Sequence, residues 1–368
     1  MKSRGFYLHL NSTRLIFASV LGICGIVLLF MFRVEAADGA ENGLLLCGRV
    51  IIPALFPFTA LAMFISRSGA ASLIGKLFSP LFRLLFGAEN EAATAVLLSF
   101  VSGYPVGARL LCGLYENSLI TAGAARRLML FCVNPGPAFV ITAVGGIMLG
   151  SVKAGAVMFT AVCLSSVTVG VLSRPVISLV PERETPPSRK LSAESRPIRY
   201  DGGLAAAFAD ACADAAGSII EICAFTVFFS VAAAVLRSFA VAASITPVVL
   251  PAIEITSGIS LASTLPLPLI AAYISFGGLS VHFQILRSSG RFFFTSGELF
   301  CSRAASAVLA ALFTALLLKF FPAEVDRSAA VIKTMVESGR GSIASSVTLI
   351  LALAVFLGAA RQQVSRRA

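Results

Sequence analysis

Two clusters of helix-breaking residues interrupt long apolar runs of this sequence, Ser102-Gly103-Tyr104-Pro105 and Asn134-Pro135-Gly136-Pro137. Proline removes a backbone donor and glycine loosens a helix, so each cluster frees backbone N–H and C=O groups that lipid cannot satisfy. Nonhelical backbone at membrane depth is tolerated where it is buried in protein or lines a wet cavity. A helix that restarts after a break points its partly positive end at the break, which suits an anion. The solute contacts predicted from these clusters are Ser102, Gly103, Tyr104, Pro105, Asn134 and Gly136.

A third cluster lies in the second half of the chain, where Gly277 and Gly278 precede His282 and Gln284 in a segment without formal charge. Polar side chains inside a membrane segment are expensive, so they favour a functional role. We add these four residues to the predicted solute site. The competing interpretations are structural: a kink at Gly103 used only for packing, and a His282 ring bonded to a neighbouring carbonyl.

Charged residues that flank or enter apolar segments are candidates for ion coupling or for pairing with one another. Glu89 and Glu91 are expected to lie at shallow depth, with Arg109 or Arg83 as partners. Glu254 enters a second-half segment, where a carboxylate suits a coupling cation or an Arg partner. Three further acidic residues recur at helical spacing and predict a solvated helix face: Asp210, Asp214 and Glu221.

Enzyme, metal and nucleic-acid signatures are absent from the sequence. It contains no H-E-x-x-H, G-x-S-x-G or phosphate-binding glycine motif, and only 2 histidines. The 8 cysteines are scattered without a C-x-x-C pair, as expected for small core residues. The net charge of +11 is spread over short loops and termini, which is typical of a membrane protein. We therefore predict no catalysis, cofactor, metal or nucleic-acid partner.

The composition identifies the elements that must position these residues as membrane helices. Hydrophobic residues make up 57% of the chain, charged residues 13%, and the mean hydropathy is +0.91. Eight to ten apolar segments approach the length of about 20 residues that spans a bilayer. We expect Leu149 to face lipid and the stretch from Arg33 to Arg49 to be a loop.

The chain divides at a linker that is rich in proline, serine and charge, residues 174–203. This linker and both termini are basic, which predicts that they lie on the cytoplasmic side. The segment around Ser102 either crosses fully, giving five crossings before the linker, or returns as a re-entrant hairpin, giving four. The predicted parts are an N-terminal transmembrane helix and loop (1–43), a first repeat (44–173), the linker (174–203), a second repeat (204–321) and a C-terminal transmembrane helix with a basic tail (322–368).

An internal repeat is suggested by an offset of 174 positions between the two halves. This offset aligns Gly103 with Gly277 and Thr121 with Thr295, and both threonines begin a Thr-x-Gly turn. Internal repeats in hydrophobic chains are typical of transporter folds, in which the solute binds between the repeats.

The segment containing Ser102 to Ala108 and Asn134 to Pro137 resembles the YlbJ family of sporulation integral membrane proteins, within the nucleoside-recognition or Gate domain proteins. The resemblance covers about Val50 to Ser306. It departs at Pro135, where relatives typically carry serine. It implies two Gate-type repeats with broken helices and re-entrant hairpins, similar to the core of concentrative nucleoside transporters. It also implies transport of dipicolinic acid across the outer forespore membrane during sporulation.

We therefore expect an all-α, polytopic protein of the bacterial cell membrane that transports a small anionic solute, with dipicolinate as the candidate and a homo-oligomer left open. One alternative is a membrane scaffold for spore maturation, which would fill the space between the repeats with apolar side chains. The other is a nucleoside or nucleobase carrier, which would offer aromatic and amide contacts instead of cationic ones.

Overall fold

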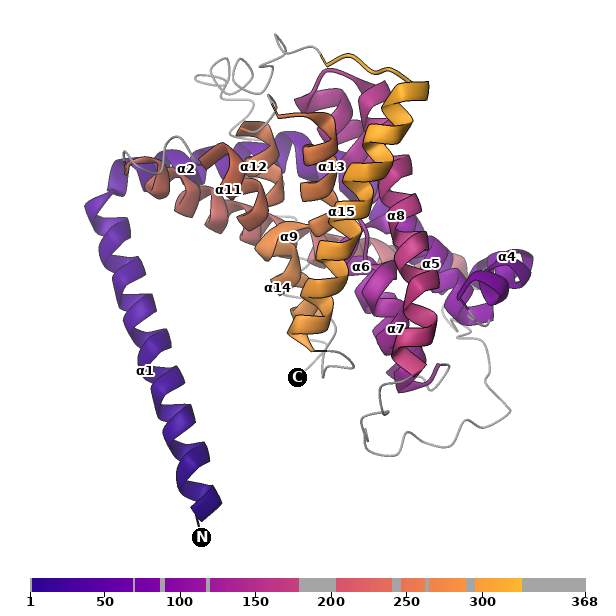
Figure 1. Ribbon diagram of the computed structural model, residues 1–368, viewed down its shortest axis with the longest axis horizontal. Coiled ribbons are helices and arrows are strands. Elements are labelled where there is room, and N and C mark those ends of the chain that lie inside the picture. Colours follow the sequence, from indigo (N-terminus) through magenta and orange to yellow (C-terminus); the bar gives the residue numbers. More distant parts are fainter. Residues whose placement is uncertain are drawn as a thin grey trace.

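The computed structural model is helical in the part of the chain that it describes, with no β-strand among those residues (Figure 1). The predicted linker falls largely outside the described residues, and so does most of the predicted C-terminal helix and tail. The described ranges are 2–68, 70–86, 90–116, 120–178, 203–239, 246–261, 265–288 and 295–325. The helices are α1 (Lys2–Met31), α2 (Arg33–Leu46), η1 (Cys47–Ile51), α3 (Ile52–Arg67), α4 (Ala70–Phe86), α5 (Asn90–Ser102), α6 (Tyr104–Glu116), α7 (Ala122–Cys132), η2 (Ala138–Met148), α8 (Val152–Ser178), α9 (Gly203–Arg237), α11 (Thr246–Ile253), α12 (Ile255–Leu261), α13 (Leu267–Phe276), α14 (Gly278–Ser288) and α15 (Ser296–Phe320).

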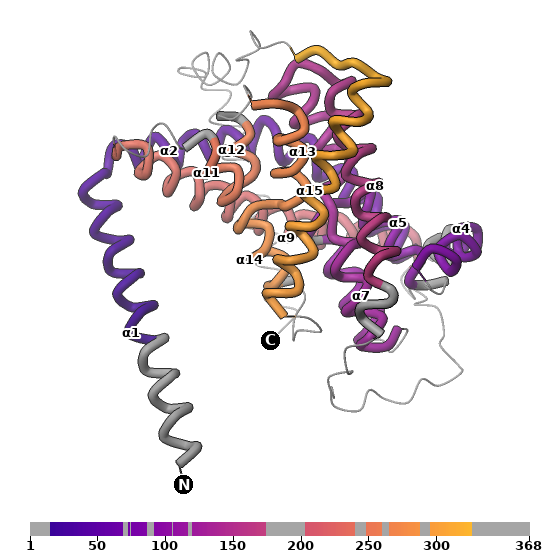
Figure 2. Tube along the Cα trace, in the orientation of Figure 1, coloured from indigo at the N-terminus to yellow at the C-terminus, as the bar shows by residue number. Residues whose placement is uncertain are grey.

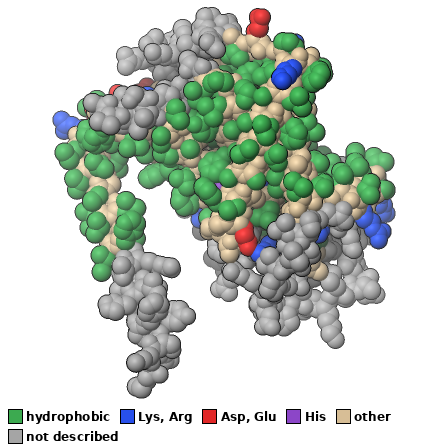
Figure 3. Space-filling model, in the orientation of Figure 1, with side chains coloured by type: hydrophobic (Ala, Val, Ile, Leu, Met, Phe, Trp, Pro, Cys, Tyr) green, Lys and Arg blue, Asp and Glu red, His purple; other side chains and the backbone are tan. Residues whose placement is uncertain are grey.

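Five helical stretches in the described part are long and apolar enough to cross a membrane. Apolar side chains cover much of the described part of the face that Figure 3 shows, as expected for a surface in contact with lipid. These observations confirm the prediction of an all-helical, multi-pass membrane protein. The five stretches are Arg33–Arg67, Val152–Ser173, Gly203–Arg237, Leu267–Arg287 and Ser296–Phe320.

The stretch after Arg33 is helical, so the loop expected there is wrong. Helix α2 runs through η1 into α3, whereas α1 extends away from the remaining helices (Figure 2). A Cβ atom added at Gly39 would lie 2.8 Å from the Cβ of Ala234, and one at Gly43 would lie 2.9 Å from the Cα of Val227. These glycines bring the α2 backbone against α9. Tertiary packing therefore keeps a polar, glycine-containing segment helical.

The predicted helix breaks are present in both halves of the chain. Gly103 separates α5 from α6 with a φ of 93°, and Gly277 separates α13 from α14 with a φ of 88°. Only glycine adopts this left-handed region at little cost. Each break ends the preceding helix in the same way, because the N–H of Gly103 donates to the carbonyl of Ser99 and that of Gly277 to Tyr273.

The helices that follow the two broken pairs also begin alike. Thr121 caps α7 by accepting a hydrogen bond from the N–H of Ala124, and Thr295 caps α15 by accepting one from Glu298. Both caps lie 174 positions apart, like the two glycine breaks. The described residues thus share local geometry at the predicted offset, while the superposition of whole repeats stays a prediction.

The run after α7 breaks at Asn134-Pro135-Gly136-Pro137 as predicted, and it continues as the π-helix η2. A Cβ added at Gly145 in η2 would lie 2.6 Å from the Cα of Gly155 in α8, so the two backbones pack closely. Leu149, which we expected to face lipid, is fully buried at the end of η2. Close packing of η2 on α8 accounts for that difference.

A candidate solute pocket between two broken helices

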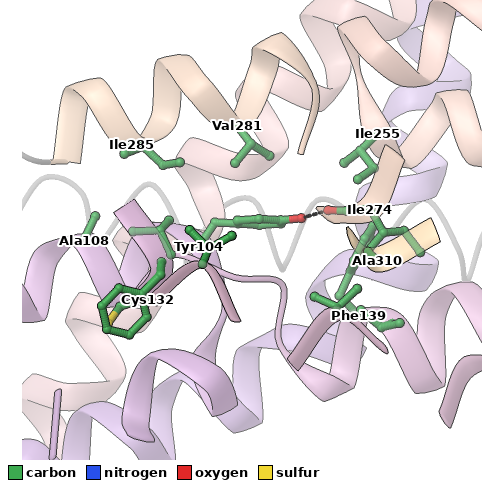
Figure 4. Close-up of a cluster of buried hydrophobic side chains, with 14 of the residues drawn as sticks. Tyr104, Ala108, Cys132, Phe139, Ile255, Ile274, Val281, Ile285 and Ala310 are labelled. Atoms are coloured by element: carbon green, nitrogen blue, oxygen red, sulfur yellow. Dashed lines mark hydrogen bonds between the residues drawn. The ribbon is translucent and has the colours of Figure 1, made fainter. Parts of the chain in front are cut away.

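The two glycine breaks meet in the interior of the protein. The Tyr104 hydroxyl, at the start of α6, donates a hydrogen bond to the carbonyl oxygen of Ile274 in the last turn of α13 (Figure 4). A Cβ added at Gly277 would lie 3.5 Å from the Tyr104 ring. One break from each half of the chain therefore forms a single contact region.

Two short helices, α11 and α12, place the turn at Glu254 against the second break. A Cβ on Gly258 would collide with the Cα of Pro251, so the two helices pack backbone to backbone. A Cβ on Gly278 would lie 3.1 Å from the carbonyl oxygen of Ile253. Because only glycine leaves room for these contacts, the turn reaches the start of α14.

The break at Asn134-Pro135-Gly136-Pro137 forms another wall of the same region. A Cβ added at Gly136 would lie 2.7 Å from the carbonyl oxygen of Val101 and 3.2 Å from the N of Gly103. The second break of the first half therefore lies directly on the first one, with no room for a larger residue.

A pocket lies where these breaks and the α11–α12 turn come together. The cavity itself has a volume of about 40 Å³, and about 570 Å³ when all the space between its side chains and its open mouth is counted. The residues that line it include no lysine or arginine, and Glu254 is the one lining residue with a formal charge. The lining residues are Leu55, Phe58, Val101, Ser102, Gly103, Tyr104, Pro135, Gly136, Ala138, Phe139, Ile222, Thr226, Glu254, Ile255, Thr256, Ser280, Val281 and Gln284.

The Glu254 carboxylate is buried and held by donors at the start of α12. It accepts hydrogen bonds from the N–H of Thr256 at 3.0 Å, from the N–H of Ser257 at 2.6 Å and from the Ser257 hydroxyl at 2.5 Å. Such donors compensate for the loss of water around a buried carboxylate. They also fix the direction in which the carboxylate meets the pocket.

Three buried polar side chains belong to the lining, and the hydroxyl of one of them, Ser280, has no hydrogen-bond partner among the described residues. The Gln284 amide is 4% exposed, and the hydroxyl-bearing residues Ser280 and Thr226 are each 1% exposed. Buried polar groups in native proteins are nearly always paired, with protein, water or a ligand. Together these residues offer an amide and two hydroxyls to a polar molecule in the pocket.

Asn134 is buried outside the pocket lining, in a network built around Arg303. The Arg303 guanidinium is fully buried and donates to the carbonyl oxygens of Leu130 at 2.6 Å and Val133 at 2.5 Å, and to Asn134 Oδ1 at 3.2 Å. Ser166 donates to the same Oδ1 at 2.5 Å. A cation from α15 thus satisfies carbonyl groups that the break at the end of α7 leaves open, where the helix dipole is negative.

Arg303 is the main residue that sequence reasoning missed. Its signal was a single arginine eight residues after Thr295, inside a helix that continues for 17 more residues to Phe320. The charge-free run from 304 to 318 that follows is nearly long enough for a membrane segment by itself, which puts this arginine at its edge. The helix bounds place it in the interior instead.

The structure brings together some of the predicted site residues and separates others. Ser102, Gly103, Tyr104, Gly136 and Gln284 line the pocket with Glu254, and Gly277 and Gly278 contact its walls. His282 is buried outside the lining, where its Nδ1 lies 2.7 Å from the carbonyl oxygen of Gly278 and its ring packs on Phe276. Glu89 and the side chains of Glu91 and Pro105 lie outside what the structure describes.

Two of the three acidic residues predicted to form a solvated face of α9, Asp214 and Glu221, pair with neighbouring helices. Arg109 on α6 binds Glu221 on α9, while the predicted pairing with Glu89 or Glu91 involves side chains outside the described part of the chain. Asp214 on α9 binds Arg67 at the end of α3. No group of three or more potential metal ligands occurs within the described residues.

Fold and pocket define an all-helical, multi-pass membrane protein with a largely apolar pocket between broken helices, which contains a few buried polar groups. The chain is 26% identical over 137 residues to the sporulation integral membrane protein YlbJ of Bacillus subtilis (strain 168). This similarity covers 37% of the chain and about a third (34%) of that curated relative. No family model and no solved structure matches the chain.

Proposed function

We propose that this protein transports a small solute across the bacterial cell membrane and binds it in the pocket between the two broken helices. The observation that carries the proposal is the set of buried polar groups of Gln284, Ser280 and Thr226 in an otherwise largely apolar pocket lining. Such groups are expensive in a membrane protein unless a solute or water meets them. A scaffold would fill this space with apolar side chains, so the lining favours transport.

Dipicolinate at the outer forespore membrane is our candidate solute. The relative's name places it in sporulation, and the sequence resemblance implies dipicolinate. Helices α6 and α14 both begin at breaks next to the pocket, and helix N-termini favour carboxylates. Glu254 adds a negative charge beside the same pocket. We therefore propose that a cation or proton at Glu254 accompanies the anion.

A nucleoside or nucleobase carrier is the second candidate. It is favoured by the amide of Gln284, by the aromatic rings of Phe58, Tyr104 and Phe139, and by a lining without lysine or arginine. These groups suit a neutral, planar, hydrogen-bonding solute. The two candidates share the pocket and differ in the charge of the ligand.

Uptake by the purified protein in liposomes separates these possibilities. We expect the protein to accumulate labelled dipicolinate faster than protein-free liposomes do, and uridine at the background rate. Uptake of uridine instead would support the nucleoside candidate. If both dipicolinate and uridine enter only at the background rate, and cooperative unfolding shows that the protein is folded, the transporter proposal is refuted. The scaffold interpretation would then remain.

A further inference from the structure

A charged triad joins three helices beside the pocket. Glu221 on α9 accepts a hydrogen bond from Arg109 Nη2 through Oε2 at 2.6 Å, and its Oε1 lies 3.1 Å from Arg287 Nε. Arg109 Nη1 also donates to the Ser218 hydroxyl at 2.7 Å. The triad thus connects α6 and α14, the two helices that follow the glycine breaks, to one carboxylate on α9.

The helix faces that line the pocket lead to this triad. On α9, Thr226 and Ile222 line the pocket, and Ser218 lies one turn further on the same face, where it meets Arg109. On α14, Gln284 lines the pocket and Arg287 follows within one turn. Four residues of an α-helix rise about 6 Å, so the charges lie within about one turn of the lining.

The triad carries the positive charge that the pocket lining lacks. Two guanidinium groups meet one carboxylate, which leaves one positive charge in excess. The Arg287 side chain is 74% exposed, whereas Glu221 is only 12% exposed. The ion pair joins Arg287 Nε to Glu221 Oε1 and is not a hydrogen bond, so the exposed guanidinium can still donate to another partner.

We propose that the triad of Arg109, Glu221 and Arg287 is an anion-receiving site at the mouth of the pocket, which binds one carboxylate of a small dicarboxylate. The proposal rests on the proposed function, because it assumes that the pocket next to the triad holds the solute. The Nη edge of Arg287 binds the carboxylate with two parallel hydrogen bonds, the geometry that suits a guanidinium. Glu221 holds Arg109 and Arg287 at this mouth, and the rest of the solute reaches Gln284.

Equilibrium binding tests this assignment independently of transport. The probes are pyridine-2,6-dicarboxylate and its uncharged diamide, titrated into the full-length protein in nanodiscs. We expect Arg287→Gln to weaken dicarboxylate binding about tenfold and to leave diamide binding unchanged, because one charged hydrogen-bonded contact is lost. Arg287→Lys should recover part of the affinity, since lysine keeps the charge without the planar fork. Higher salt should weaken dicarboxylate binding to the wild type more than to Arg287→Gln.

Arg67→Gln is the matched control, because Arg67 also pairs with an acidic residue of α9 but lies away from the pocket lining. It should bind the dicarboxylate like the wild type. The assignment is overturned if the wild type binds no dicarboxylate, if Arg287→Gln binds it with unchanged affinity, or if the diamide loses as much affinity. Dicarboxylate binding without uptake in liposomes would refute transport and leave the triad intact. Uptake by Arg287→Gln at the wild-type rate and affinity would refute the triad alone.

Discussion

Replacing Arg303 with methionine should destabilise the protein without touching the pocket lining directly. The substitution keeps most of the side-chain length but removes the donors to the carbonyls of Leu130 and Val133 and to Asn134 Oδ1. Each buried acceptor left without a partner costs about 1–3 kcal/mol. Part of this cost is offset, because the cation no longer has to be buried. Loss of one member of a buried charged network typically costs about 3–5 kcal/mol, which is our expectation here.

Equilibrium unfolding of the purified protein in mixed micelles measures this loss. Lys319→Met is the matched control, because Lys319 lies on the same helix but is exposed at its end. Its free energy of unfolding should stay within about 0.5 kcal/mol of the wild type. If Arg303→Met loses no more than Lys319→Met, the guanidinium does not hold the break after α7, and our account of that break is wrong.

Three further substitutions test the packing at the breaks and at α2. Gly103→Val should lower the free energy of unfolding by about 1–2 kcal/mol or more and abolish solute uptake, because φ at Gly103 is 93°. Gly113→Val is the control, because a Cβ at that position meets no atom within 4 Å. Equal uptake by both variants would contradict the prediction. Asn134→Leu should lower the free energy of unfolding by about 1–3 kcal/mol, through the Arg303 network, and unchanged stability would argue against that network. Gly39→Leu should lower the free energy of unfolding by about 1–3 kcal/mol in the same assay, because the larger side chain forces α2 away from α9. Gly22→Leu is the control and should lower it little, because a Cβ at Gly22 meets no atom within 4 Å. Equal losses of stability in the two variants would refute the contact between α2 and α9.

Backbone chemistry made the breaks predictable from the sequence. Gly103 and Gly277 end their helices in a conformation that favours glycine, and prolines mark the break after α7. Thr121 and Thr295 were recognisable as the start of two Thr-x-Gly turns, and the structure shows that both residues are N-caps. These signals are local, so one stretch of sequence was enough to find them.

The site was less predictable, because its chemistry depends on contacts between distant segments. Ser280 and Thr226 look like ordinary polar residues of apolar helices until α9 and α14 are placed beside the pocket. Arg303 and Asn134 lie 169 positions apart, and no local pattern links them. Arg109 pairs with Glu221 on α9, 112 positions away, and no local pattern predicts that contact.

The central claim is that a solute occupies the pocket where the two glycine breaks meet. Thiol modification of Gln284→Cys, in a protein whose native cysteines are replaced, tests it most directly. The side chain lines the pocket, so bound dipicolinate should slow its reaction with a small methanethiosulfonate reagent. Phe283→Cys, at the adjacent exposed position, should react at the same rate with and without dipicolinate. Equal rates for Gln284→Cys with and without dipicolinate, at concentrations that saturate uptake, would contradict the account.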